Sequence, residues 1–278
     1  MTHFAQELRD GRHLGITGLG DPDATRLVIF CHPSPGSGGF DPDPTLTSNS
    51  EVRIIAHDRP GYGSTDLVES ERPPMGAWIA DLDEYLRLTE ANADAVSTID
   101  FGRVSVIGWG LGAMYAAALA ATYPEQFERL ALIEPTAPTK ERRDTDGPVD
   151  VRLEDRDALA RLHGHLGAVD RLDAMLATDD ATAGMDFDKK VMADDSWLPT
   201  LNDIMAETMI VCGSDADWYA ERIPGASRTT GSAEPTATIV EAWPEVLRFM
   251  KPRESTDGVR LSDRRGSSPL PQFQRRPD

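Results

Sequence analysis

Three glycine-rich loops of this chain carry side chains that could do chemistry. They are residues 32–38 (HPSPGSG), residues 57–64 (HDRPGYGS) and residues 108–112 (GWGLG). Histidine can transfer protons and serine can attack a carbonyl carbon, whereas glycine lets backbone N–H groups approach a ligand oxygen. Each loop follows a short apolar run, and the active sites of open parallel sheets lie at the carboxyl ends of their strands. The three loops are therefore expected to meet at one edge of a sheet.

In this order and spacing, the loops resemble those of the α/β-hydrolase superfamily. The first matches the loop that supplies an oxyanion-hole N–H in that family, the second its DRPGYGxS turn, and the third its nucleophile elbow, G-x-S-x-G. A LALIEP strand end, a helical stretch and a GSDAD turn follow in the family's order, so the resemblance spans roughly residues 12–250. It implies an α/β fold, with a mostly parallel doubly wound sheet and a small helical cap. It also implies descent from hydrolases of small esters, amides or similar bonds.

The middle of the elbow is Gly110, at the position where the family carries its nucleophilic serine. Glycine has no side chain, so it cannot attack a carbonyl. The elbow forces this residue into a backbone conformation that costs other residues about 1–3 kcal/mol and that glycine adopts freely. The replacement is therefore expected to spare the fold and to remove the chemistry.

The catalytic histidine of the family is also unmatched. It follows the last strand, but the final histidine of this chain is His165, and Ser232 stands nearest the expected position. A serine hydroxyl cannot accept a proton near pH 7 as an imidazole can. The family's acid follows the preceding strand, where Asp215 and Asp217 are both candidates. Without an imidazole to orient, either carboxylate is explained equally well as part of a turn.

An oxyanion-hole-like site is expected to survive because it is made of backbone. The resemblance assigns to it the N–H groups of Ser34 and Leu111, and the helix that begins after Gly110 would favour an anion at its N-terminus. With Trp109 and His32, these residues form the expected ligand site. The expected ligand is a small molecule that is apolar or carries a carbonyl or carboxylate. Neither a metal nor a cofactor is expected.

Two other functions remain open. In the first, the chain is an active hydrolase with rearranged groups, in which Ser34, Ser64 or Tyr115 replaces the nucleophile and His163 or His165 replaces the base. In the second, the fold is kept only as a scaffold for protein interaction. His163 and His165 are two positions apart, so they do not share a helix face, and they do not predict a metal site.

Four further residues have simpler explanations than catalysis. His32 and His57 follow predicted strands, where polar side chains commonly fix loops by hydrogen bonds. Cys31 and Cys212 stand in apolar runs of strand length, so they are expected to be core thiols rather than nucleophiles.

Apolar runs of strand length alternate with helical patterns along the chain. Such fully apolar strands are typical of a parallel sheet covered on both faces. The expected strands are residues 27–31, 52–56, 104–107, 130–133 and 209–212.

A cap insertion is expected at about residues 136–206, between the fourth and fifth of these strands. Within it, the leucine stripe from Leu159 to Leu176 predicts one amphipathic helix. One hydrolase domain is expected at residues 1–251. Residues 252–278 contain four prolines and few large apolar residues, so they are expected to be a disordered tail.

The composition limits the partners. Of 278 residues, 47 are acidic and 28 basic, giving a formal net charge of −19, which would be repelled by nucleic acid and by anionic membranes. Two cysteines make no disulfide framework, and the N-terminus has no apolar signal segment. The uncharged residues 104–123 are explained by a strand, a turn and a helix rather than a membrane span. A soluble cytoplasmic protein is therefore expected, and the sequence does not predict its oligomeric state.

Overall fold

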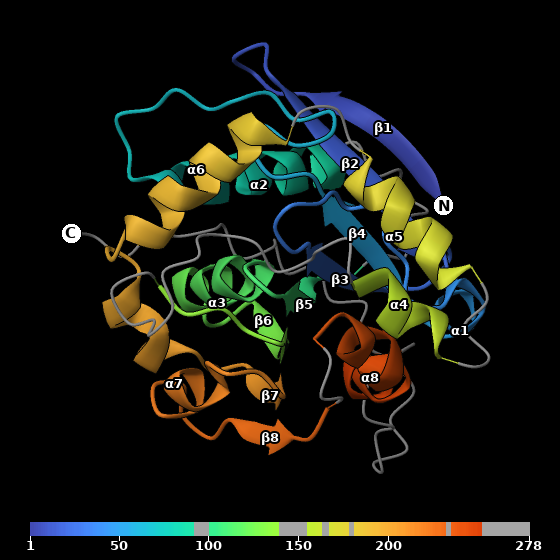
Figure 1. Ribbon diagram of the computed structural model, residues 1–278. Helices are drawn as coiled ribbons and strands as arrows, with labels where there is room; N and C mark the ends of the chain where they lie inside the picture. The colour runs from blue at the N-terminus through green and yellow to red at the C-terminus, as the bar shows by residue number, and fades with distance from the viewer. Residues whose placement is uncertain (92–99, 139–154, 163–166, 178–180, 232–234, 252–278) are drawn as a thin grey trace, which may run out of the picture.

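The fold is an eight-stranded, mostly parallel sheet, seen here in a computed structural model (Figure 1). The structure describes the chain except residues 92–99, 139–154, 163–166, 178–180, 232–234 and 252–278. The strand order is β1-β2-β4-β3-β5-β6-β7-β8. The strands are β1 (Thr2–Glu7), β2 (His13–Gly20), β3 (Arg26–Cys31), β4 (Arg53–His57), β5 (Asp100–Trp109), β6 (Phe127–Ile133), β7 (Glu207–Val211) and β8 (Ser227–Thr229).

From β4 to β8 all neighbouring strands in the sheet are parallel, which confirms the expected fold class. Strands β1 and β2 pair in antiparallel fashion, and β2 continues antiparallel onto β4. These two strands and β8 were not predicted from the sequence. β1 is exposed along most of its length, and β8 has only three residues. Both β1 and β8 therefore lack the apolar run that marks the central strands.

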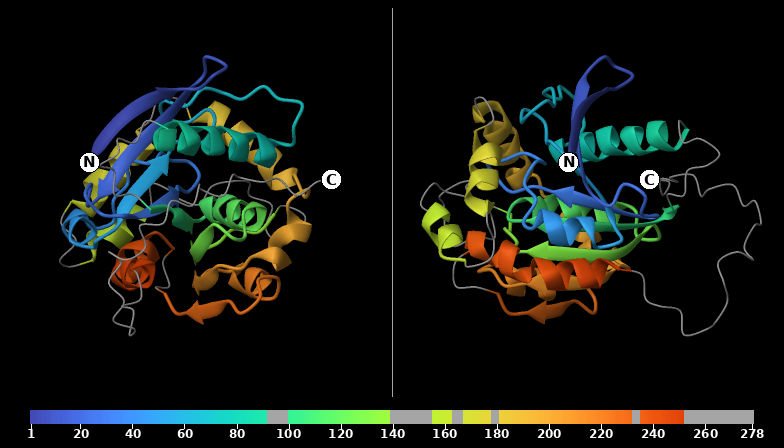
Figure 2. Two further views of the ribbon diagram at one scale, coloured as in Figure 1. Left: turned by 180° about the vertical axis from the view of Figure 1, so that it is seen from behind. Right: turned by 90° about the vertical axis from the view of Figure 1, so that its right-hand side faces the viewer.

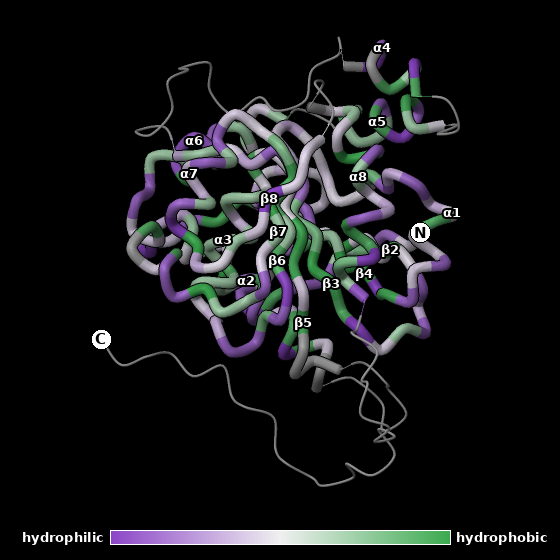
Figure 3. Tube along the Cα trace, turned by 90° about the horizontal axis from the view of Figure 1, so that it is seen from below, coloured by the Kyte–Doolittle hydropathy of each residue, from purple (hydrophilic) through white to green (hydrophobic). Residues whose placement is uncertain are grey.

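Helices cover both faces of the sheet, which explains why the central strands are apolar on both sides. The helices α2 (Pro74–Ala91), α3 (Gly112–Thr122) and α7 (Ala216–Ala220) share one core with alternate strand residues such as Val106 and Leu132. The helices α1 (Pro44–Ser48) and α8 (Pro235–Met250) pack on the other face, against Ile107 and Ile133. Figure 2 shows α2 and α8 on opposite sides of the sheet, and Figure 3 shows β3, β6 and β7 as a largely hydrophobic tube between them.

Between β6 and β7 the described residues form three helices and a short 3-10 helix. They are α4 (Asp155–Ala160), α5 (Ala168–Leu176), α6 (Thr182–Ala193) and η2 (Leu198–Asp203). The prediction of one helix along the Leu159–Leu176 stripe is wrong. The stripe is divided between α4 and α5, and Gly167, with φ of 77°, precedes α5. The apolar stripe is confirmed, because Leu159 and Leu172 are buried in the core that α8 shares, and Leu162, Val169 and Leu176 pack against it.

The uncharged residues 104–123 are shared between β5 and α3, as the sequence predicted. Among the described residues, no helix is both long and apolar enough to cross a membrane. The expected tail at 252–278 lies outside the described residues, and the domain limits remain a prediction.

Candidate active site

The elbow of the sequence motif is a turn between β5 and α3. Gly110 has φ of 58°, in the left-handed region that glycine adopts at no steric cost. Its N–H donates to the carbonyl of Ile133 (2.9 Å), and its own carbonyl accepts from Ala113 N–H (3.0 Å). Gly110 therefore has the backbone conformation of a nucleophile elbow but no side chain that could serve as the nucleophile.

The loop after β3 lies directly against this elbow. A Cβ atom on Gly112 would overlap the carbonyl oxygens of Cys31 and His32, so only glycine permits this approach. Strands β3 and β5 are neighbours, with Cys31 beside Gly108, and this pairing aligns the two loops. The sequence-predicted loops thus meet at one edge of the sheet. That the N–H groups of Ser34 and Leu111 converge on one oxygen remains a prediction.

His32 is wholly buried and holds both ring nitrogens in hydrogen bonds. Nε2 accepts from the backbone N–H of Arg59 (3.1 Å), so the proton of the neutral ring is on Nδ1, which lies 2.8 Å from the carbonyl of Pro33. Burial, and then the charge of Arg59, hold the pKa of His32 well below its usual value. His32 is therefore neutral, and because both of its ring nitrogens are engaged in hydrogen bonds, neither is available to accept a proton from a substrate or nucleophile.

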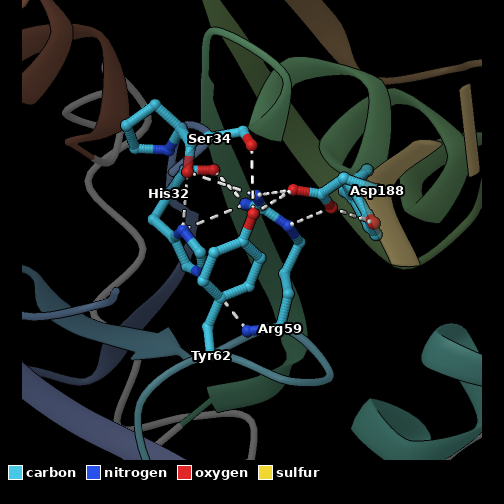
Figure 4. Close-up of polar contacts among 7 residues, drawn as sticks. His32, Ser34, Arg59, Tyr62 and Asp188 are labelled. Carbon is cyan, nitrogen blue, oxygen red and sulfur yellow. Dashed lines mark hydrogen bonds and ion pairs between the residues drawn. The ribbon is translucent and has the colours of Figure 1, made fainter. Parts of the chain in front are cut away.

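Arg59 is the centre of a buried polar network that joins the core to the cap (Figure 4). Its Nε and Nη2 donate to the two carboxylate oxygens of Asp188 on α6, at 3.0 and 2.8 Å. The guanidinium also donates to the carbonyls of His32 and Pro33. The side chains of Arg59 and Asp188 are both 0% exposed. A bidentate pair of this kind neutralises the aspartate and fixes its orientation.

Two tyrosines complete the shell of Asp188. The hydroxyl of Tyr62 donates to Oδ2 (2.7 Å) and that of Tyr115, on α3, donates to Oδ1 (2.8 Å). Burial, and then the neighbouring carboxylate, raise the pKa of both phenols, so both remain protonated. Tyr115 was a candidate nucleophile in the sequence. Its hydroxyl is instead a donor committed to the aspartate.

Ser34 is connected to the same network. Its Oγ lies 3.0 Å from the hydroxyl oxygen of Tyr62. Tyr62 has one proton, which it gives to Asp188, so the serine must be the donor to the tyrosine. The partner in this contact is a phenol with a raised pKa, which does not act as a base towards the serine. The other candidate hydroxyl, Ser64, instead lies 3.0 Å from Nε2 of His3 on the edge strand β1.

Trp109 and Leu111 flank Gly110 with buried side chains on opposite faces of the sheet. The indole of Trp109 packs against Phe40, with ring centroids 5.3 Å apart, in the core cluster that includes Met175 of the cap. Leu111 belongs to the opposite cluster, with α2 and α3. What Leu111 offers a ligand is therefore its backbone rather than its side chain.

His57 is buried against α2. Its Nε2 accepts from the indole N–H of Trp78 (2.8 Å), and the two rings stack. Burial, and then Arg59, lower the pKa of His57 to about 3. Its Nδ1 has no hydrogen-bond partner among the residues that the structure describes. This histidine, like His32, is held neutral.

Each of the two aspartates after β7 has a partner in the structure. Asp215 accepts from the backbone N–H of Ala137 (2.8 Å), and Asp217 forms an exposed ion pair with Arg228. Ser232, His163 and His165, which the sequence also singled out, lie outside the described residues. Cys31 is buried as expected, whereas Cys212 is partly exposed at the end of β7, with φ of 50°.

Three site residues were not found by sequence reasoning. Arg59 and Tyr62 stood within the recognised turn motif but were not assigned roles. Asp188 lies in the sequence FDKK, which looks like a solvated helix face, and nothing local shows that it turns inward. Among the described residues, no group of three His, Cys, Asp or Glu side chains is placed to hold a metal ion.

The comparisons with known proteins agree with the fold. A model of the Alpha/beta hydrolase family matches residues 28–260. A 2-hydroxy-6-oxononadienedioate/2-hydroxy-6-oxononatrienedioate hydrolase of Burkholderia vietnamiensis is 26% identical over 47% of this chain and 43% of its own length. Human serine hydrolase BPHL is 30% identical over 43% of this chain and 38% of its own length. The matched segments thus span less than half of these two relatives.

Solved structures share the fold along nearly the whole chain. A hydrolase from Pseudomonas aeruginosa PA01 has a TM-score of 0.65 at 17% identity, covering 90% of this chain and 98% of its own. A meta-cleavage product hydrolase from Pseudomonas fluorescens IP01 has a TM-score of 0.62 at 18% identity, covering 88% and 95%. By the family model and the fold together, this chain belongs to the alpha/beta hydrolase family.

Proposed function

We propose that this chain is a catalytically impaired member of the family that binds a small ligand, apolar or with a carbonyl or carboxylate group, between the core and the cap. The observation that carries the proposal is Gly110, which has the elbow backbone, with φ of 58°, and no nucleophilic side chain. The family mechanism needs a side chain at this point to attack the substrate carbonyl.

The surrounding groups support the same conclusion. A substitute nucleophile needs a base within hydrogen-bond reach. Ser34 donates to a phenol, and His32 has both nitrogens occupied. Asp188 is the one carboxylate reached through Tyr62, and Arg59 neutralises it. The chain Ser34–Tyr62–Asp188 is the observation that favours an active hydrolase as a second candidate, but it ends in a carboxylate that is already paired with Arg59.

The ligand class follows from the elbow and the relatives. The helix α3 directs the positive end of its dipole towards Gly110, which suits a carbonyl or carboxylate oxygen. The Burkholderia relative is named for hydrolysing an oxo-dicarboxylate, a compound with both groups. A retained preference for such compounds is part of the proposal.

The catalytic half of the proposal is tested by assaying the native chain against a panel of p-nitrophenyl esters, beside the Gly110→Ser/Ser232→His variant. The native chain is expected to give no turnover above the uncatalysed rate, and the double variant to gain measurable turnover. Native turnover that disappears in Ser34→Ala would overturn the proposal and establish the rearranged hydrolase.

The binding half is tested with a panel of small aryl and alkyl carboxylates and ketones. A compound that binds the native fold raises its melting temperature, and the rise grows with the ratio of its concentration to Kd. The same compound is expected to inhibit the Gly110→Ser/Ser232→His variant competitively, because both effects use one site. A panel that neither stabilises the native chain nor inhibits the variant would contradict ligand binding at the elbow.

A further inference from the structure

Strand β1 forms one edge of the sheet, at the end opposite β8 (Figure 1). It pairs with β2 on one side, and among the described residues no strand pairs with it on the other. All but one of its residues are exposed, so both faces of the strand reach solvent. β1 contains neither lysine nor proline, which protect many edge strands from pairing with another chain. The edge strand β8, in contrast, has only three residues, so β1 is the edge that can accept a further strand.

The hydrogen bonds of the β1–β2 hairpin show which backbone groups of β1 face this open edge. The N–H of Leu8, directly after β1, donates to the carbonyl of Arg12 (2.7 Å), which continues the register of the two strands. Successive residues of an antiparallel strand direct their N–H and C=O groups to opposite sides. The even-numbered residues of β1 therefore bond to β2. The backbone groups of His3, Ala5 and Glu7 consequently point to the open edge.

The same edge carries exposed apolar surface. Large apolar side chains are exposed at four positions among the described residues, and two of these positions are here. Met1, directly before β1, is 84% exposed, and Phe4, within the strand, is 45% exposed. Exposed apolar side chains that lie close together often mark a surface of interaction. A strand added at this edge would cover part of both side chains.

A second copy of β1 fits this edge in one antiparallel register. When Ala5 lies opposite Ala5 of the second copy, His3 of each copy lies opposite Glu7 of the other. All three outward-facing residues then exchange backbone hydrogen bonds with the second copy. The carbonyl of Glu7 exchanges its contact with the side-chain amide of Gln6 (2.9 Å) for a backbone partner. A shift of two residues in either direction leaves one of the three without a partner in the strand.

The side chains favour the same register. His3 and Glu7 are the basic and the acidic residue of β1, and the register places each opposite the other, which is a favourable cross-strand pair. The ring of His3 is held by the hydroxyls of Thr17 and Ser64, both at 3.0 Å, so its position is fixed before association. On the other face of the strand, the two Phe4 side chains lie diagonally across from each other, within reach of aromatic rings.

From this arrangement we propose that β1 is an interaction surface whose partner is β1 of a second copy of this chain, paired antiparallel with Ala5 at the two-fold axis. The same patch is used on both copies, so the contact closes into a dimer with one continuous sheet rather than growing into a filament. A single strand pair buries little surface, and each copy carries a formal net charge of −19, so the dimer is expected to be weak and reversible. The inference is independent of the proposed ligand and of catalysis.

The first test measures molecular mass against concentration by sedimentation equilibrium. The native chain is expected to shift reversibly from a monomer of 30.4 kDa to a dimer as its concentration rises. Ala5→Pro removes the N–H at the two-fold axis, which no β1–β2 bond uses, and is expected to raise the dimer Kd by about tenfold or more. Ala5→Thr keeps that N–H and suits a strand, so it should dimerise as the native chain does. A native chain that stays monomeric, or a dimer that survives Ala5→Pro, means that β1 is not the interface.

The second test fixes the register and does not need the proline variant to fold. Opposite residues of a hydrogen-bonded pair have Cα atoms about 5.5 Å apart, which suits a disulfide. Ala5→Cys is therefore expected to form a disulfide-linked dimer under mild oxidation. Gln6→Cys should form far less, because the two cysteines are displaced along the strands. The native chain, treated in the same way, shows what Cys31 and Cys212 contribute. Equal crosslinking by the two variants, or none by Ala5→Cys, rejects this pairing.

Discussion

Arg59 and Asp188, 129 residues apart in the chain, form a bidentate ion pair in which neither side chain is exposed. The pair joins the turn after β4 to the cap helix α6. The two charges neutralise each other, and the hydroxyls of Tyr62 and Tyr115 donate hydrogen bonds to the aspartate. A buried pair of this kind gives modest net stability, but the loss of one partner leaves an unpaired charge in the interior.

The substitution Asp188→Asn is therefore expected to lower the free energy of unfolding by about 3–5 kcal/mol, because Arg59 stays charged and buried. The control is Asp186→Asn on the same helix, which breaks an exposed pair with Lys189 and should cost under about 1 kcal/mol. Urea unfolding of the three proteins measures both values. Equal losses in the two variants would mean that the buried pair does not hold α6.

The elbow glycines should differ sharply in what they tolerate. Gly110→Ala places a side chain at φ of 58° and is expected to cost about 1–2 kcal/mol. Gly112→Ala should cost more than that, because its Cβ overlaps the Cys31 and His32 carbonyls, and backbone cannot move aside as a flexible side chain can. Denaturant unfolding compares the two, and a smaller loss for Gly112→Ala would contradict the close approach of the two loops.

The elbow and its loops could be predicted from sequence because their signals are local. Gly108, Gly110 and Gly112 stand within five residues, and the apolar runs before each loop have strand length. Asp188 could not be predicted, since only the tertiary packing of α6 against Tyr62 turns it inward.

Replacing glycine by alanine is expected to have opposite effects on stability at two positions that are equivalent within their helices. Gly184 is the third residue of α6, and a Cβ there would overlap the ring of Tyr62. Gly76 is the third residue of α2, and a Cβ there meets nothing within 4 Å. Gly184→Ala is expected to destabilise by about 1–3 kcal/mol, and Gly76→Ala to stabilise by up to about 1 kcal/mol. Thermal unfolding resolves the two signs, and stabilisation by Gly184→Ala would show that the helix is free to move off the turn.

The buried histidines predict how stability depends on pH. The pKa of His57 is about 3 in the folded state, against about 6.5 in the unfolded chain. Between these values the unfolded state binds a proton that the folded state does not, so stability is lost as the pH falls from about 6.5 towards 3. One such group contributes a slope of about 1.4 kcal/mol per pH unit.

The variant His57→Gln isolates this contribution, because it keeps an acceptor for the Trp78 indole and removes the titration. Unfolding free energies measured between about pH 4.5 and 6 should therefore fall less steeply in the variant, by about 1.4 kcal/mol per pH unit. His32 remains in both proteins, as do the carboxylates that titrate in the same range, so the difference between the two slopes belongs to His57. Parallel pH profiles would mean that His57 is protonated inside the folded protein.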